Sequence, residues 1–204
     1  WDKTIYIKVV QGFLKQGDTI TVVFGDKSQG SLGMRLQTFC EESYEFHTLI
    51  DPIATFCYQP VSEQPVIKIV PGQPERFLAV APTVCEVGTP FSVRLKGEDL
   101  WGNPSDQCNQ TFLIQCIVKI DGLPNSITFK SGNFSQIISG LKVSSESFFS
   151  IDFLDKSRKV VFSTNPIRSV HNPKYKYFWA DLHGQSEETI GTGSVEQYFK
   201  FARD

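Results

Sequence analysis

The chain has 204 residues, 40% of them hydrophobic and 13% aromatic, and a formal net charge of −2 at pH 7. This length gives room for one large domain or two small ones with a packed core. The nearly balanced charge argues against nucleic-acid or anionic-membrane partners, and no apolar run reaches the roughly 20 residues that span a bilayer.

Residues 4 to about 74 show the pattern of short β-strands. Apolar and polar residues alternate from Thr19 to Phe24 and from Tyr44 to Asp51, and period two is typical of half-buried strands. The run from Met34 to Phe39 also predicts a strand. Pro71-Gly-Gln-Pro74 is the best candidate for a joint between domains, because proline cannot sit inside a β-ladder. We therefore predict a β-sandwich-like module over residues 1–74.

Residues 75–170 show clearer alternation. Phe91, Val93 and Leu95 share one face of a predicted strand, and Trp101-Gly-Asn-Pro104 predicts the turn that follows. Further runs are expected to be strands at 112–120, with an inward apolar row, and at 126–130, 134–138, 148–153 and 160–163. About seven strands with turn signals every 8 to 12 residues indicate a β-sandwich. This part resembles bacterial immunoglobulin-like domains through Gly88, Pro90, Phe91, Val93, Asp99 and Gly102-Asn103, which implies a scaffold or spacer role.

Residues 171–204 change in character. Tyr177 to Ala180 are consecutive apolar or aromatic residues and predict a strand buried on both faces, as in parallel sheets. After a Gly-rich turn, Ser194-Val-Glu-Gln197 predicts a capping box for an amphipathic helix. The whole is one β-loop-α unit. One such unit cannot form a sheet or barrel, so we expect the chain to be a fragment that ends as a new domain begins.

The densest polar chemistry lies after the predicted strand, at Asp181-Leu-His183. Residues i and i+2 of an extended segment point to the same side, so Asp181, His183 and Gln185 could converge on one point. The residues alone leave two readings open, a metal or catalytic site and a satisfied polar cluster that caps a sheet. His47 and His171 are expected to be surface or hydrogen-bonded residues.

The five cysteines form no CxxC pair, and their odd number fits no complete framework of intrachain disulfides. We therefore expect reduced, mostly buried thiols, which slightly favours a cytoplasmic location. The residues concerned are Cys40, Cys57, Cys85, Cys108 and Cys116.

Asp181-Leu-His-Gly-Gln-Ser186, with Gly191-Thr-Gly-Ser194 and Tyr198-Phe-Lys-Phe-Ala-Arg203, closely resembles the start of the catalytic part of the microbial family called domain of unknown function 3604. The resemblance continues upstream through Gly17-Asp-Thr-Ile20, Phe24-Gly-Asp26, Arg35-Leu-Gln-Thr-Phe39, Asp51-Pro52 and Glu98-Asp-Leu-Trp-Gly-Asn-Pro104. That catalytic part is similar to the PHP phosphoesterases, which are metal-dependent hydrolases with a distorted (β/α) barrel.

The resemblance implies that residues 171–204 begin a truncated PHP-like barrel. The PHP opening motif reads His-x-His, and both imidazoles bind metal. His183 matches the first position, but Gln185 occupies the second, and its amide oxygen is a weaker ligand. We therefore expect His183 to bind metal and Asp181 to orient it or bind directly. Three roles stay open for Gln185: it could be part of an altered metal site, support the metal ligands from behind, or contact the substrate.

The fold expected is thus mainly β, with two β-sandwich-like modules followed by the first unit of that barrel. The function implied is the N-terminal portion of a hydrolase that uses zinc, manganese or iron on a phosphoester or other small molecule. The fragment alone is expected to be inactive, with the remaining ligands beyond residue 204; whether it binds metal stays open. The alternative is a carbohydrate-binding, protein-binding or spacer module with a vestigial metal motif.

Overall fold

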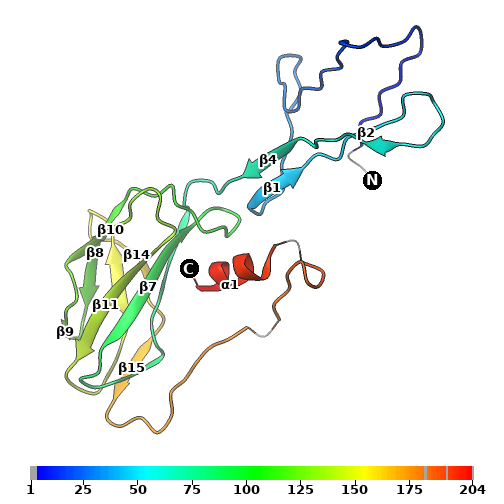
Figure 1. Ribbon diagram of the computed structural model, residues 1–204. Coiled ribbons are helices and arrows are strands. Elements are labelled where there is room, and N and C mark those ends of the chain that lie inside the picture. Colours follow the sequence, from blue (N-terminus) through cyan, green and yellow to red (C-terminus); the bar gives the residue numbers. More distant parts are fainter. Residues whose placement is uncertain (1–3, 182, 192, 204) are drawn as a thin grey trace. The chain divides into compact units, whose positions relative to one another are not determined.

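In a computed structural model of the protein (Figure 1), residues 4–181, 183–191 and 193–203 are described. Their regular structure is mainly β, and the helix described is α1, Val195–Arg203. No helix in these ranges has the length and apolar character needed to cross a bilayer. The chain divides into two compact units, Trp1–Gln37 and Thr38–Asp204. The predicted boundaries after residues 74 and 170 both fall inside the second unit and stay predictions.

The described part of the first unit, residues 4–37, forms turns and irregular segments without strands or helices. The strand predicted at Thr19–Phe24 is therefore wrong, and so is the one at Met34–Phe39, which crosses into the second unit. Alternation makes a strand only where a neighbour pairs with its backbone and a core covers its apolar face. No strand is assigned to either run, and their apolar side chains stay largely exposed, with Val22 at 43% and Leu36 at 40%.

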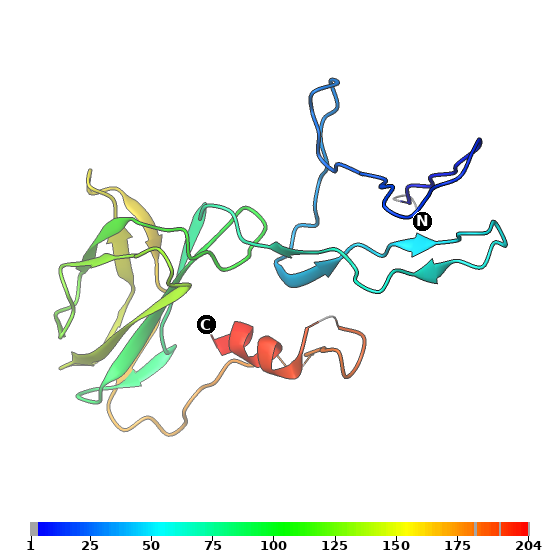
Figure 2. The same cartoon turned by 45° about the horizontal axis from the view of Figure 1, so that its top comes forward.

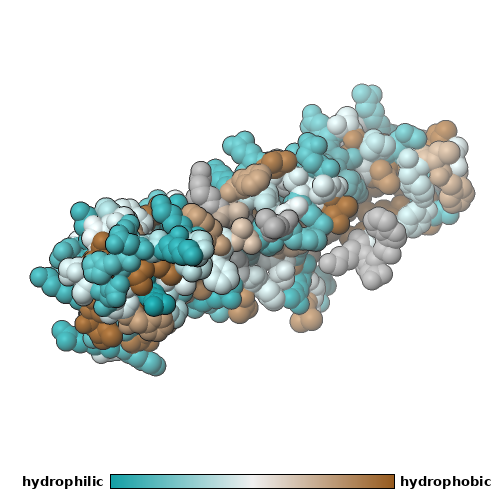
Figure 3. Space-filling model, turned by 90° about the horizontal axis from the view of Figure 1, so that it is seen from below, coloured by the Kyte–Doolittle hydropathy of each residue, from teal (hydrophilic) through white to brown (hydrophobic). Residues whose placement is uncertain are grey.

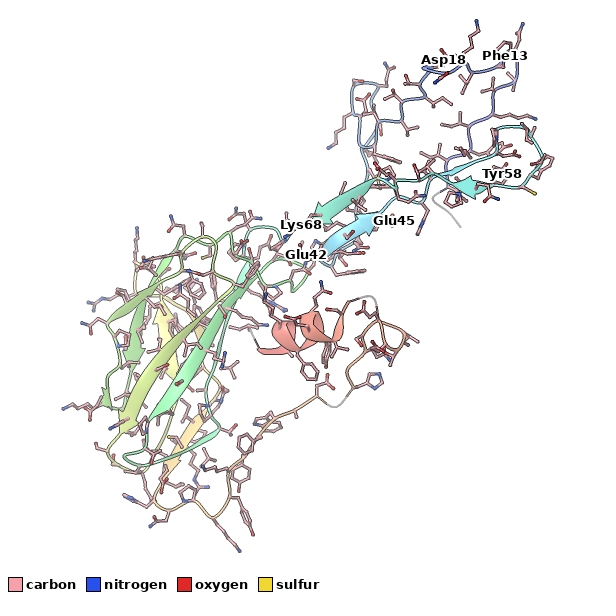
Figure 4. The ribbon with its side chains drawn as sticks, in the orientation of Figure 1. Phe13, Asp18, Glu42, Glu45, Tyr58 and Lys68 are labelled. Atoms are coloured by element: carbon pink, nitrogen blue, oxygen red, sulfur yellow. The ribbon has the colours of Figure 1, made fainter. Side chains whose placement is uncertain are left out.

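The second unit begins with two small antiparallel ribbons. In the first, β1 (Glu41–Glu45) pairs with β4 (Val66–Ile69), with Tyr44 opposite Ile67. In the second, β2 (Leu49–Ile50) pairs with β3 (Gln59–Pro60). The single strand predicted from Tyr44 to Asp51 is thus split in two. An ion pair of 2.8 Å between Lys68 Nζ and Glu42 Oε2 crosses the first ribbon (Figure 4).

Residues 76–170 hold the remaining strands in three sheets, which Figures 1 and 2 show gathered in one body. One sheet has the order β10-β8-β13-β14, the second β5-β7-β11-β9 and the third β12-β15-β6. Neighbours are antiparallel except β15 and β6, which run parallel. The strands are β5 (Arg76–Val80), β6 (Val84–Glu86), β7 (Phe91–Glu98), β8 (Thr111–Cys116), β9 (Ile120–Asp121), β10 (Ser126–Thr128), β11 (Ser135–Val143), β12 (Ser147–Phe149), β13 (Ile151–Leu154), β14 (Val160–Ser163) and β15 (Ile167–Val170).

The core of this body is built from the inward rows of the two four-stranded sheets. Phe91, Val93 and Leu95 of β7 are buried, which confirms the predicted face of that strand. Across from them the β8 and β13 side chains Phe112 and Phe153 are fully buried. Aromatic rings fill the space between the sheets, with Phe77, Phe112, Phe129, Phe153 and Phe162 in stacked or edge-to-face contact.

The long strand predicted over residues 112–120 is interrupted. Strand β8 ends at Cys116, Ile117 is 85% exposed, and β9 then pairs with β11 in the other sheet. The inward row itself is confirmed, because Phe112 and Ile120 are buried and the members between them are half-buried. The chain therefore crosses from one sheet to the other where a single strand was expected.

The turn after β7 is organised by the carboxylate of Asp99, which is 5% exposed. Its Oδ1 accepts the backbone N–H groups of Trp101 and Asn103, both at 2.9 Å, and its Oδ2 accepts the Gly72 N–H at 3.1 Å. The Asn103 side chain donates to both oxygens. Burial alone raises the pKa of the Asp99 carboxyl, but these hydrogen bonds outweigh it, and the pKa lies below its ordinary value.

The same turn holds two distant segments against the sandwich. The Asn103 amide accepts from the Cys40 N–H at 3.1 Å and donates to the Thr38 carbonyl at 2.8 Å. The Ser105 hydroxyl donates to the Gly72 carbonyl at 2.6 Å. Residues 38–40 and 71–72 are thus both fixed to the turn by polar contacts.

The connector after β15 is extended but unpaired. The strand predicted at Tyr177–Ala180 is wrong, since the structure assigns none there and Trp179 is 84% exposed. A buried strand needs neighbours on both edges, and nothing in the described chain pairs with these residues. The indole N–H of Trp179 donates instead to the Thr83 hydroxyl at 2.8 Å.

On the face shown in Figure 3, apolar side chains reach the surface at scattered places among polar ones.

Candidate functional site

The segment around His183 begins with a local turn. The Asp181 Oδ1 atom accepts a hydrogen bond of 2.9 Å from the His183 backbone N–H, which is an Asx-type contact. The carboxylate of Asp181 therefore fixes the backbone beneath the imidazole, and both residues are exposed.

The side chains of His183 and Gln185 lie next to each other. Their Nε2 atoms are 3.4 Å apart, so the amide can donate to the ring when the imidazole is neutral with its proton on Nδ1. This is the same-side placement expected for residues i and i+2. Asp181 differs, because the contact of its carboxylate is with the backbone of His183 and not with either side chain.

The chain after Gln185 closes on itself in a compact turn. The carbonyl of Ser186 accepts the N–H groups of Thr189 and Gly191, both at 2.9 Å, and the Glu187 N–H donates to the Gly193 carbonyl. A Cβ at position 191 would lie 2.8 Å from the Gln185 carbonyl, so only glycine fits this close approach. The carboxylates of Glu187 and Glu188 stay exposed on the outside of the turn.

Helix α1 starts with the capping box that the sequence predicts. The Ser194 hydroxyl accepts the Gln197 N–H at 3.2 Å, and the Gln197 side-chain oxygen accepts the Ser194 N–H at 2.8 Å. The first turn then places Tyr198 against Gly184, where an added Cβ would lie 2.7 Å from the tyrosine ring and its hydroxyl. The residue between His183 and Gln185 is therefore packed against the helix.

The donors at this site fit a divalent metal only as part of a larger set. His183 offers an imidazole and Asp181 a carboxylate, which are the ligand types that zinc, manganese and iron prefer. Within residues 4–181, 183–191 and 193–203, no group of three or more His, Cys, Asp or Glu side chains could hold a metal ion. A metal bound here needs further ligands.

The other two histidines make ordinary surface contacts. His47 Nδ1 lies 3.1 Å from a carboxylate oxygen of Glu45, and both side chains are exposed. The backbone N–H of His171 donates to Glu146. Both contacts are of the kind expected for surface or hydrogen-bonded histidines.

A second polar constellation was not predicted from the sequence. An open recess of about 540 Å³ lies where the start of β8 meets the turn between β13 and β14. In that turn the Asp155 Oδ1 atom accepts from the Ser157 hydroxyl and from two backbone N–H groups, and these bonds lower the pKa of its carboxyl. No local sequence pattern could reveal this recess, because the two segments that line it are about 45 positions apart. The lining residues are Asn109, Gln110, Thr111, Asp155, Lys156 and Ser157.

All five cysteines are free thiols. Cys85 and Cys108 are buried and Cys116 is half-buried, and burial raises the pKa of each of these thiols. Cys40 and Cys57 are exposed, so two of the five thiols are buried and a third is half-buried.

No protein-family model matches this chain, and no curated protein is similar to it.

Proposed function

We propose that this chain is the N-terminal portion of a PHP-like metal-dependent hydrolase, in which residues 171–204 begin the catalytic barrel. The adjacency of the His183 and Gln185 side chains carries the proposal, because the family's opening motif uses the same two positions for ligands. A metal bound there would act as a Lewis acid and lower the pKa of a coordinated water. The β-rich residues upstream serve as scaffold.

Each residue has a distinct part in this proposal. His183 would hold the metal ion with its imidazole. Asp181 fixes the backbone of His183 through the Asx contact and so orients the imidazole. Gln185 replaces the second histidine of the motif and, beside His183, either supplies a weak amide-oxygen ligand or contacts the phosphoester or other small substrate.

The test is elemental analysis of the parent protein, the longer protein of which this chain is proposed to be the N-terminal portion. It is purified from cells grown with zinc, manganese and iron. We expect close to one equivalent of divalent metal or more in the parent. The His183→Ala variant should lose metal, and the matched His171→Ala variant should keep it. A parent without metal, or equal metal in both variants, would contradict the proposal.

A second candidate is a carbohydrate-binding module with no working metal site. The recess beside β8 favours it, since amide, hydroxyl and carboxylate groups are the partners that sugar hydroxyls require. The elemental analysis separates the two functions, because this module predicts no metal in the parent or in the His183→Ala protein. The free thiols support a reducing, cytoplasmic location for either.

A further inference from the structure

Gly184 lies in the sequence between His183 and Gln185, whose side chains would bind the metal or contact the substrate. Its Cα faces the ring of Tyr198 so closely that an added Cβ would be 2.7 Å from the ring carbon Cζ and from the hydroxyl oxygen, and 2.8 Å from Cε1. Real Cβ atoms do not approach other atoms this closely. The backbone of residue 184 is thus packed directly on an aromatic ring.

The residue after Gly184 also has a close backbone neighbour. A Cβ at Gly191 would lie 2.8 Å from the carbonyl carbon and oxygen of Gln185, so the returning turn presses on the next residue along. Gly184 therefore has Tyr198 as its close neighbour, and Gln185 has Gly191.

Tyr198 is itself held in place by the start of helix α1. Its backbone N–H donates to the Ser194 carbonyl at 3.0 Å, in the first turn of the helix. Its side chain is half-buried, whereas the neighbouring ring of Phe199 is 66% exposed. The three atoms nearest to the Cβ position of Gly184 all belong to Tyr198.

We propose that Tyr198 is a positioning residue that holds the His183 imidazole and the Gln185 amide side by side by packing on Gly184; this rests on the proposed function only for its consequence in metal binding. Glycine has more backbone freedom than any other residue, and the ring removes that freedom at position 184. Loss of the ring frees the backbone between the two side chains, and they separate.

The first test needs no metal. In the metal-free protein, NMR should show a cross-peak between a ring proton of His183 and the side-chain amide protons of Gln185. We expect the cross-peak to persist in Tyr198→Phe, which keeps the ring, and in Phe199→Ala, which removes the neighbouring ring. It should disappear in Tyr198→Ala while the helix amide signals of Gln197 remain. A cross-peak that survives in Tyr198→Ala overturns the inference.

The second test measures how Tyr198 affects metal binding. Zn²⁺ affinity, measured by chelator competition, should fall roughly 10-fold or more in Tyr198→Ala, the range seen when residues behind metal ligands are lost. Tyr198→Phe and Phe199→Ala should stay near the parent value. Equal Zn²⁺ affinity in Tyr198→Ala and the parent overturns the inference. A parent that binds no Zn²⁺ contradicts the proposed function instead, and the NMR result then decides the role of Tyr198.

Discussion

The Asp99 carboxylate accepts hydrogen bonds from its own turn and from Gly72, which is 27 positions away. Hydrogen bonds to a charged acceptor contribute more than neutral ones, and a buried donor that loses its partner costs further free energy. One side chain thus holds the stretch before β5 to the end of β7. The turn at Trp101-Gly-Asn-Pro104 was predictable from local chemistry, but the contact with Gly72 was not, since no local pattern encodes a partner so distant.

Asp99→Asn should lower the free energy of unfolding at pH 7 by about 2 kcal/mol, because the amide loses the charge and one acceptor oxygen. The folded-state pKa of Asp99 is lowered, so its stabilisation is complete above the unfolded value of about 3.9 and is lost as the pH falls through the lower folded value. Urea unfolding of parent and variant between pH 2 and 7 measures this.

The control is Asp121→Asn, a change at an exposed carboxylate on β9. It should leave the unfolding free energy at pH 7 within about 0.5 kcal/mol of the parent. A stability difference between Asp99→Asn and the parent that stays constant down to pH 2 would show that the charge of Asp99 is not what stabilises the turn.

At the scale of elements, the accuracy of the sequence predictions follows the availability of partners. Most strands expected between residues 75 and 170 formed, although those at 112–120 and 148–153 are each divided in two, because their pairing partners lie in the same stretch, as β7 does between β5 and β11. Thr19–Phe24 and Tyr177–Ala180 have equally suitable residues, yet no described strand pairs with them. An alternating pattern shows which side chains a segment could bury. The segment becomes a strand only where a neighbouring strand pairs with it.

Helix α1 was predictable because its start depends on local contacts alone. Ser194→Ala removes the hydroxyl that accepts the Gln197 N–H, and capping residues of this kind contribute about 1 kcal/mol. We expect hydrogen exchange at the Gln197 amide to become about fivefold faster, as that free energy implies. Ser131→Ala, in an exposed turn of the sandwich, should leave it unchanged; unchanged exchange in Ser194→Ala itself would argue against the cap.

At the scale of the molecule, burial is concentrated between residues 69 and 169. Among the residues whose burial the structure describes, all but one of the buried ones lie there, and the exception is Ser186 in the turn before α1. Residues 4–37 carry many large apolar side chains but bury none of them. Composition alone predicted enough apolar residues for a core, but it could not say which part of the chain would supply that core. The candidate site was likewise predictable only in part. The placement of His183 beside Gln185 follows from period two, whereas the packing of Gly184 on Tyr198 could not be foreseen from a local pattern.

Two phenylalanine substitutions test this uneven distribution. Phe112→Ala, at a fully buried ring, should lower the free energy of unfolding by about 3–5 kcal/mol, the cost of a large core cavity. Phe13→Ala, at a ring that is 77% exposed, should change it by less than about 0.5 kcal/mol. Urea denaturation followed by tryptophan fluorescence measures both. A comparable loss in the two variants would mean that residues 4–37 have a core of their own.

The parallel pairing of β6 with β15 also determines how the sandwich carries tension. The stretch entering the sandwich runs alongside the stretch leaving it, through Ala79 beside Thr164 and through Val84, Cys85 and Glu86 beside Arg168, Ser169 and Val170. A pull on the two ends of this part of the chain draws these neighbours in opposite directions along a common line. Their hydrogen bonds are then loaded together in shear and do not open one after another, so this pairing resists extension along that line.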